Sequence, residues 1–247
     1  MKSLQNAPYA PTQDPIEVVY EDADLAVIIK PSNLLTVPGR GPEKQDCAET
    51  RLRAGGRAFV RAAHRLDQDT SGLVIFGLSP QGHRAANMMF EARGVAKRYA
   101  ALCWTNADKL PENDVNYADN GVGIERQNAN NMRNTWLIDL PLCLDWPNRP
   151  RHHVNLTQGK PSQTGVSVQA CLPNDPADTI RVDLTPITGR SHQLRVHLSH
   201  THFPICGDPL YGKKDDGFDR LCLHATHLCF DHPLTGERLS FDSPAPF

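Results

Sequence analysis

Three short clusters of polar residues hold the groups of this chain that could do chemistry. The first, residues 64–72 (HRLDQDTSG), sets Asp67 between an arginine and a Thr-Ser-Gly turn. Hydroxyl groups can satisfy the main chain of such a turn and glycine permits an unusual backbone conformation, so the pattern predicts a rigidly held carboxylate. The second cluster is residues 97–99 (KRY), and the third is residues 188–197 (TGRSHQLRVH). Together they offer a carboxylate, several arginines, a tyrosine and histidines.

A hydrolase of the Ser/His/Asp type is one alternative, because His64, Asp67 and Ser71 lie close together in the sequence. The members of such a triad generally come from separated segments that the fold brings together. The chain also has no Gly-x-Ser-x-Gly motif, which marks the nucleophile in one large class of these enzymes. This alternative is therefore disfavoured.

A metal site is a second alternative, suggested by His192, His197, His200 and His202. The sequence contains no His-Glu-x-x-His motif, and the five-residue spacing of His192 and His197 takes them off one helical face. We therefore expect no metal, and we interpret these histidines as hydrogen-bonded structural residues or as contacts to phosphate.

The elements next to the first two clusters predict how these are positioned. The apolar run 72–78 predicts a buried strand directly after the first cluster. Ser79 then stands at the N-cap position of a predicted helix, and a proline follows at its first position. We expect this helix to end near Arg93, directly before a glycine. The second cluster enters a predicted strand over residues 97–104.

The third cluster leads into a helix predicted from about Ser191 to His200. If the helix is regular, residues four apart share a face, which pairs Ser191 with Arg195 and Gln193 with His197.

The rest of the chain predicts an α+β fold with a mixed, largely antiparallel central sheet and few flanking helices. We expect a tail over residues 1–15 and one catalytic domain over 16–247, interrupted by a polar insertion at 106–134 that lacks apolar periodicity. The other expected elements are a hairpin of strands 16–20 and 24–30, a helix at 46–57, and strands at 136–140, 163–171, 180–187, 221–230 and 238–242.

Charge is segregated along the chain although its formal net value is only -2. Residues 51–99 contain nine Lys/Arg against three Asp/Glu, and residues 149–195 contain six against three. Binding of phosphate depends on a local basic face and not on the net charge, so both segments are candidates for contact with nucleic acid. A basic surface that is merely solvated would give the same pattern, so charge alone does not distinguish binding of nucleic acid from a solvated surface.

The seven cysteines are odd in number, widely spaced and without a Cys-x-x-Cys pair, which fits neither a disulfide framework nor a zinc ribbon. We expect buried, reduced thiols. No apolar run is long enough to span a bilayer and no secretory signal is visible, so we expect a cytoplasmic protein without membrane contact.

The three clusters resemble, in the same order, the motifs of the RluA family of pseudouridine synthases. Residues 64–72 resemble its catalytic motif, residues 97–99 its second motif and residues 189–197 its third. Two later runs, residues 202–212 (HFPICGDPLYG) and 221–225 (LCLHA), are also similar. Five motifs in order are hard to obtain by chance, and the resemblance extends from about Ile16 to the C-terminus apart from the insertion.

The resemblance implies an isomerase that converts uridine to pseudouridine in structured RNA without a cofactor. It implies that Asp67 is the indispensable carboxylate, while its role in breaking the bond stays open. Arg195 is our candidate partner for Asp67, since a guanidinium favours the ionised carboxylate. Tyr99 would stack on uracil and remove the final proton from C5, and Arg65 would fill the space left by the flipped base. The other expected substrate-binding residues are His64, Lys97, Arg98, Arg190, His192, Gln193 and Leu223.

A shorter resemblance, in residues 143–150 (CLDWPNRP) and 159–161 (GKP), is to the subgroup called ribosomal large subunit pseudouridine synthase A. It implies two substrates, a tRNA anticodon stem-loop and a 23S rRNA hairpin. We expect no S4-type RNA-binding module, since only fifteen residues precede the first predicted strand, and we expect a monomer. An enzyme for only one of these RNAs, or a non-catalytic RNA-binding protein of the same fold, remains the alternative.

Overall fold

A computed structural model describes residues 9–105 and 135–247, which form two compact units. Of the described residues, 9–97 and 225–245 belong to the first unit, and 98–105, 135–224 and 246–247 belong to the second. Part of the expected tail and the whole expected insertion at 106–134 lie outside the described residues.

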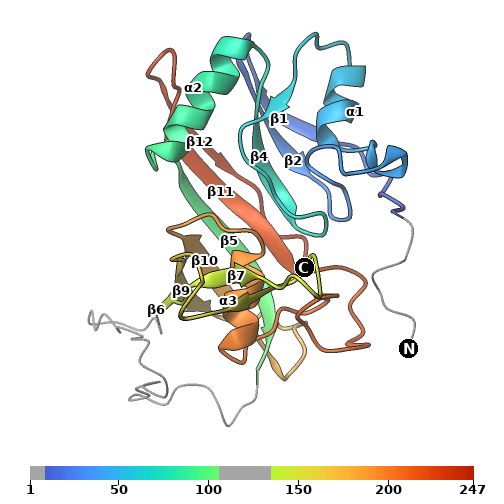
Figure 1. Ribbon diagram of the computed structural model, residues 1–247, viewed down its shortest axis with the longest axis vertical. Coiled ribbons are helices and arrows are strands. Elements are labelled where there is room, and N and C mark those ends of the chain that lie inside the picture. Colours follow the sequence, from blue (N-terminus) through green and yellow to red (C-terminus); the bar gives the residue numbers. More distant parts are fainter. Residues whose placement is uncertain (1–8, 106–134) are drawn as a thin grey trace. The chain divides into compact units, whose positions relative to one another are not determined.

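The first unit is built on a sheet in the strand order β1-β2-β4-β11, with β12 paired to β11 and β3 paired to β4 (Figure 1). The predicted hairpin of β1 and β2 is confirmed as an antiparallel pair, and Asp22 closes its turn by accepting hydrogen bonds from the N–H groups of Asp24 and Leu25. The strands of this unit are β1 (Glu17–Glu21), β2 (Leu25–Lys30), β3 (Arg61–Ala62), β4 (Ser71–Gly77), β11 (Leu223–Asp231, which begins in the second unit) and β12 (Arg238–Asp242).

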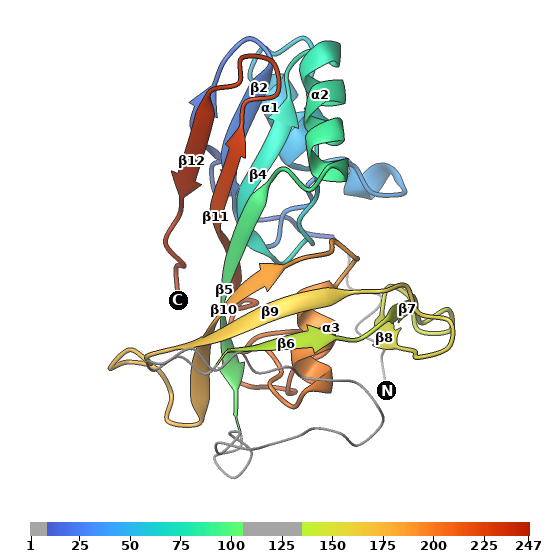
Figure 2. The same cartoon turned by 90° about the vertical axis from the view of Figure 1, so that its left-hand side faces the viewer.

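Strand β4 is buried at every position, as its unbroken apolar sequence predicts. Beside it runs helix α2 (Pro80–Glu91; Figure 2). The helix starts as expected, because the Ser79 hydroxyl accepts a hydrogen bond from the N–H of Gly82. A shorter helix, α1 (Ala48–Ala54), follows a 3-10 turn, η2 (Pro42–Lys44). The core between α2 and the sheet consists of Leu25, Val27, Leu73, Ile75, Ala86, Val95, Leu228, Phe230 and Leu239.

The second unit has its own antiparallel strands in the order β5-β10-β9-β6 and a separate hairpin of β7 and β8. Buried and partly exposed positions alternate along β6 and much of β9 and β10, the pattern of strands with one face against a core. Its elements are β5 (Ala96–Trp104, which begins in the first unit), β6 (Thr135–Asp139), β7 (Leu142–Leu144), β8 (His152–Val154), β9 (Gln163–Gln169), β10 (Thr179–Pro186) and helix α3 (Gln193–His200).

Helix α3 begins two residues later than the sequence suggested. His192 has a left-handed backbone with φ of 56°, which is not compatible with a right-handed α-helix. Ser191 therefore lies before the helix, and the expected pairing of Ser191 with Arg195 on one helical face is wrong. The expected pairing of Gln193 with His197 is confirmed, because both side chains contact the hydroxyl of Thr164 on β9.

The cysteines only partly match the expectation. Cys47, Cys103, Cys206 and Cys222 are buried, whereas Cys171 is exposed. In the described part of the chain, no helix combines the length and apolarity that a membrane span needs.

Candidate active site

The loop that carries Asp67 is fixed through its main chain. Lys30, at the end of β2, is fully buried, and its Nζ donates hydrogen bonds to the carbonyls of Pro31 (2.8 Å), Leu34 (2.6 Å) and Gln68 (3.1 Å). Buried carbonyls need such donors, so one side chain ties the residue after Asp67 to the loop that follows β2.

Two hydroxyl groups complete this support. The Thr36 hydroxyl accepts from the N–H of Leu66 (3.1 Å) and donates to the carbonyl of the same residue (2.8 Å). The Ser32 hydroxyl donates to the carbonyl of Asp69 (2.6 Å). The main chain is thus hydrogen-bonded on both sides of Asp67, by side chains that lie outside the Thr-Ser-Gly turn on which the sequence prediction rested.

Gly72, at the end of this loop, is required for two reasons. Its φ of +113° is rare for any residue with a side chain, and a Cβ there would lie 2.5 Å from the main-chain nitrogen of Ala225 on β11. The glycine, five residues after Asp67, therefore lets the start of β4 pass close to β11.

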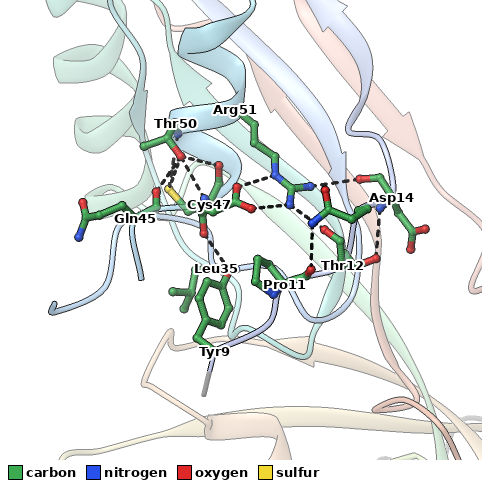
Figure 3. A network of polar contacts seen from close by, with 11 residues as sticks. Tyr9, Pro11, Thr12, Asp14, Leu35, Gln45, Cys47, Thr50 and Arg51 are labelled. Carbon is green, nitrogen blue, oxygen red and sulfur yellow. Dashed lines mark hydrogen bonds and ion pairs between the residues drawn. The ribbon is translucent and has the colours of Figure 1, made fainter. Parts of the chain in front are cut away.

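A further network, drawn in Figure 3, ties residues 9–14 to α1. The Arg51 guanidinium donates two hydrogen bonds to the Asp46 carboxylate (2.7 and 2.8 Å) and one to the carbonyl of Thr12 (2.7 Å). Thr12 in turn donates its N–H to the carbonyl of Asn33 (3.2 Å), whose side-chain oxygen accepts from the amide of Gln68 (2.8 Å). The segment 9–14 is therefore linked to the residue after Asp67.

His64 is held as a neutral acceptor. Its Nε2 accepts a hydrogen bond from the N–H of Ile75 (3.1 Å), and its ring lies 4.5 Å from that of Phe90. Burial, with a smaller contribution from the charge of Lys97, lowers the pKa of His64 to about 3. Burial also lowers the pKa of Lys97, whose Nζ lies 5.8 Å from the Phe90 ring. These contacts favour a structural role for His64, whereas the neighbouring Arg65 is exposed and accessible to RNA.

In the second unit, Arg195 is buried on α3 and forms a bidentate ion pair with Asp208. Its Nε and Nη2 donate to the two carboxylate oxygens at 2.8 and 2.7 Å, and the guanidinium lies 5.3 Å from the ring centre of Tyr211. Burial alone would raise the pKa of Asp208, but Arg195 and the N–H groups of Leu210 and Tyr211 hold it below its usual value. The ion pair fixes the guanidinium in one orientation.

Asp208 and Tyr211 were not among the predicted site residues, although both lie in the run 202–212 that resembled the family. The Tyr211 hydroxyl accepts from the N–H of His152 (2.8 Å) and lies 2.7 Å from Nδ1 of His192. These contacts join Arg195, Asp208, Tyr211 and His192 in one cluster. Only the sequence position of the motif could have pointed to them.

The loop before α3 is shaped by Gln193. Its amide nitrogen donates to the carbonyl of Gln163 (2.9 Å) and the hydroxyl of Thr164 (3.0 Å), and its oxygen accepts from the hydroxyl of Thr188 (2.7 Å) and the N–H of Arg190 (3.0 Å). This favours positioning of the Arg190 loop over direct contact with substrate.

His197, also on α3, is buried among uncharged partners. Its Nε2 donates to the carbonyl of Leu140 (3.0 Å), so the neutral ring accepts at Nδ1 from the Thr164 hydroxyl (2.9 Å). Burial lowers its pKa to about 4. Among the described residues no group of three or more His, Cys, Asp or Glu has the arrangement of a metal site.

The remaining predicted residues are placed as follows. Tyr99 is buried on β5 opposite Leu184, Arg98 beside it is exposed, and Leu223 is buried at the start of β11. Asp67 belongs to the first unit, and Tyr99 and Arg195 to the second, so the cooperation of these three residues stays a prediction.

Comparisons with known proteins agree on one family. Residues 24–200 match the model of the RNA pseudouridylate synthase family. The chain is 40% identical over 242 residues to a protein of Pasteurella multocida named dual-specificity RNA pseudouridine synthase RluA, covering 97% of this chain and 98% of the relative. The protein of that name from Escherichia coli K12 is 36% identical over 244 residues, with the same coverage. The structure of human RNA pseudouridylate synthase domain containing 1 superposes with a TM-score of 0.68 at 26% identity, covering 96% of this chain and 86% of the human one.

Proposed function

The chain belongs to the RNA pseudouridylate synthase family and isomerises uridine in RNA, and we propose that its substrates are a tRNA anticodon stem-loop and a 23S rRNA hairpin. The observation that carries the proposal is the identity, over nearly the full length, to relatives named as dual-specificity enzymes. We further propose that the protein acts as a monomer in the cytoplasm, where both RNAs are found.

The reaction breaks the N1–C1′ bond of uridine, turns the base and joins C5 to C1′; C5 loses its proton and N1 gains one. Atoms and charge balance without an oxidant, a reductant or a group donor. The chain therefore has to supply a carboxylate, a base pocket and a route for one proton. We assign the carboxylate to Asp67, because hydrogen bonds from Lys30, Thr36 and Ser32 fix the main chain on both sides of it.

The other proposed roles are those that the family resemblance implies, and the placement of each residue within its own unit supports them. Tyr99 has an aromatic face for the uracil and a hydroxyl that can accept the C5 proton. Arg195, oriented by Asp208, is the cation proposed to keep Asp67 ionised. Arg65 is exposed and long enough to enter the stack when the target base flips, which costs about a few kcal/mol.

The test maps pseudouridine in both RNAs by carbodiimide labelling and primer extension, with wild-type protein and Asp67→Asn. Asp69→Asn is the control, because it removes a carboxylate from the same loop and leaves the main-chain bond from Ser32 to residue 69 in place. We expect one stop in each RNA for the wild type and the control. The Asp67→Asn variant should be at least about a thousandfold slower while still binding RNA. A stop in only one RNA would reject dual specificity, and tight binding without any stop would favour a non-catalytic protein.

A further inference from the structure

Trp146 lies at the tip of the β7–β8 hairpin and is 63% exposed. The turn that presents it is well bonded. Asp145 donates its N–H to the carbonyl of Arg151 (2.9 Å), and the Asn148 amide donates to both oxygens of the Asp145 carboxylate (3.1 and 3.0 Å). The exposure of the indole ring is therefore a fixed feature of the fold.

The indole ring carries a cation on one face. The Arg149 guanidinium lies 4.3 Å from the ring centre, within the range of a cation–π interaction. The other two tryptophans are used inside the protein: Trp136 is buried, and Nε1 of Trp104 donates to Asp216 (3.0 Å). An exposed aromatic ring backed by an arginine forms no part of the core and is available to a partner.

The base of the same hairpin is bonded to the Arg195 cluster. His152 donates its N–H to the Tyr211 hydroxyl (2.8 Å), and Arg151 donates to the carbonyl of Leu210 and lies 5.6 Å from the Tyr211 ring. Arg195 also packs on Tyr211. The hairpin that bears Trp146 is therefore connected through Tyr211 to the Arg195 cluster, which we assign to catalysis.

We propose that Trp146 and Arg149 form a stacking platform for an unpaired base of the RNA substrate, separate from the target uridine. The proposal rests on the proposed function only in taking RNA as the partner. Every base has a flat face that can stack on an aromatic ring, and arginine adds attraction to both the base and the phosphate. The charge of the tip favours RNA over an apolar protein partner, since Arg149 and Arg151 are exposed and the only carboxylate, Asp145, is occupied by Asn148.

The test measures RNA affinity in the Asp67→Asn background, so that no turnover occurs, by the fluorescence anisotropy of labelled RNA. The probes are an anticodon stem-loop and a fully paired RNA duplex of equal length. We expect Trp146→Ala to weaken stem-loop binding about ten- to a hundredfold and to leave duplex binding unchanged. Trp146→Phe should keep most of the affinity. Leu172→Ala, which removes a side chain that is 54% exposed in the same unit, should bind as the parent does.

Three results would overturn the platform: unchanged stem-loop affinity in Trp146→Ala, an equal loss for stem-loop and duplex, or a change in oligomeric state with unchanged RNA affinity. Circular dichroism of each variant checks its folding, and Arg149→Gln gives a second probe with a smaller expected loss. The outcome is separate from that of the proposed function. If the wild-type protein binds RNA through Trp146 but makes no pseudouridine, the proposed function is wrong and the stacking platform is still supported.

Discussion

The Asp67 loop and the Arg195 helix are held in different ways. Around Asp67 the described bonds go from the side chains of Lys30, Thr36 and Ser32 to main-chain groups. Arg195 is instead held by a buried ion pair with the side chain of Asp208. A loop that is fixed by several bonds to its main chain tolerates the loss of one of them. Removing one partner of a buried ion pair instead leaves the other partner as an uncompensated buried charge.

The difference suits the two roles. A reacting carboxylate has to be placed accurately, and hydrogen bonds to the main chain on both sides of it can do this. An arginine that acts as a fixed positive charge benefits from a bidentate partner, which sets the plane of the guanidinium. The two units should therefore respond unequally to substitutions of similar size.

The largest effect is expected from Asp208→Asn. The substitution keeps the shape and removes the charge that balances the buried Arg195, so the free energy of unfolding should fall by about 3–5 kcal/mol. Urea denaturation measures the fall. Asp231→Asn, which breaks the exposed pair with Arg238, is the control and should cost less than about 1 kcal/mol. Equal losses in the two variants would remove the contrast between the units.

Gly72→Ala should come next. A Cβ there strains the backbone and collides with Ala225, whereas at Gly236, where φ is +77°, a Cβ meets nothing within 4 Å. We expect Gly236→Ala to cost about 1 kcal/mol for its backbone conformation, and Gly72→Ala to cost at least about 2 kcal/mol more. Denaturation midpoints and activity at saturating RNA measure both effects. Full activity in Gly72→Ala would show that the Asp67 loop does not depend on this close approach.

Acid should weaken both units through a histidine in each, His64 and His197, whose pKa is lowered in the folded chain. The pKa values of His64 and His197 lie near 3 and 4, below the ordinary value of 6.5, so below pH 6.5 the unfolded chain binds protons that the native chain excludes. The free energy of unfolding should then fall by about 1.4 kcal/mol per pH unit for each histidine, down to about pH 4 for His197 and pH 3 for His64.

Urea denaturation at pH 7.5 and pH 5.5 tests this dependence. His64→Gln keeps a hydrogen-bond acceptor without titrating, so it should lose less stability between these two values than the wild type does. An unchanged slope would show that His64 is protonated without cost in the native unit.

The smallest effect is expected from Arg51→Lys, which keeps the charge but loses the forked bonds to Asp46 and the bond to Thr12. The pair is partly exposed, so the loss should be about 0.2–1 kcal/mol. Limited proteolysis should nonetheless cut residues 9–14 faster than in the wild type. Arg40→Lys, at an exposed position, is the control. Equal cleavage of the two variants would show that Arg51 does not hold residues 9–14 in place.

The sequence alone determined those features of this protein that depend on neighbouring residues. The hairpin turn at Asp22, the cap at Ser79 and the buried strand β4 follow from local chemistry, and each was expected where the structure has it. The start of α3 was misjudged by two residues, because His192 adopts a left-handed conformation that is uncommon for any residue other than glycine.

Tertiary structure alone decided which side chains support the predicted site. Lys30 meets Gln68 across 38 positions, and Arg195 meets Asp208 across 13. No local pattern encodes such pairs, because a buried lysine or aspartate has the same sequence signature as an exposed one until the fold removes water from around it. The sequence therefore predicted Asp67 as the reacting group, and only the folded chain showed how its loop is held and what orients Arg195.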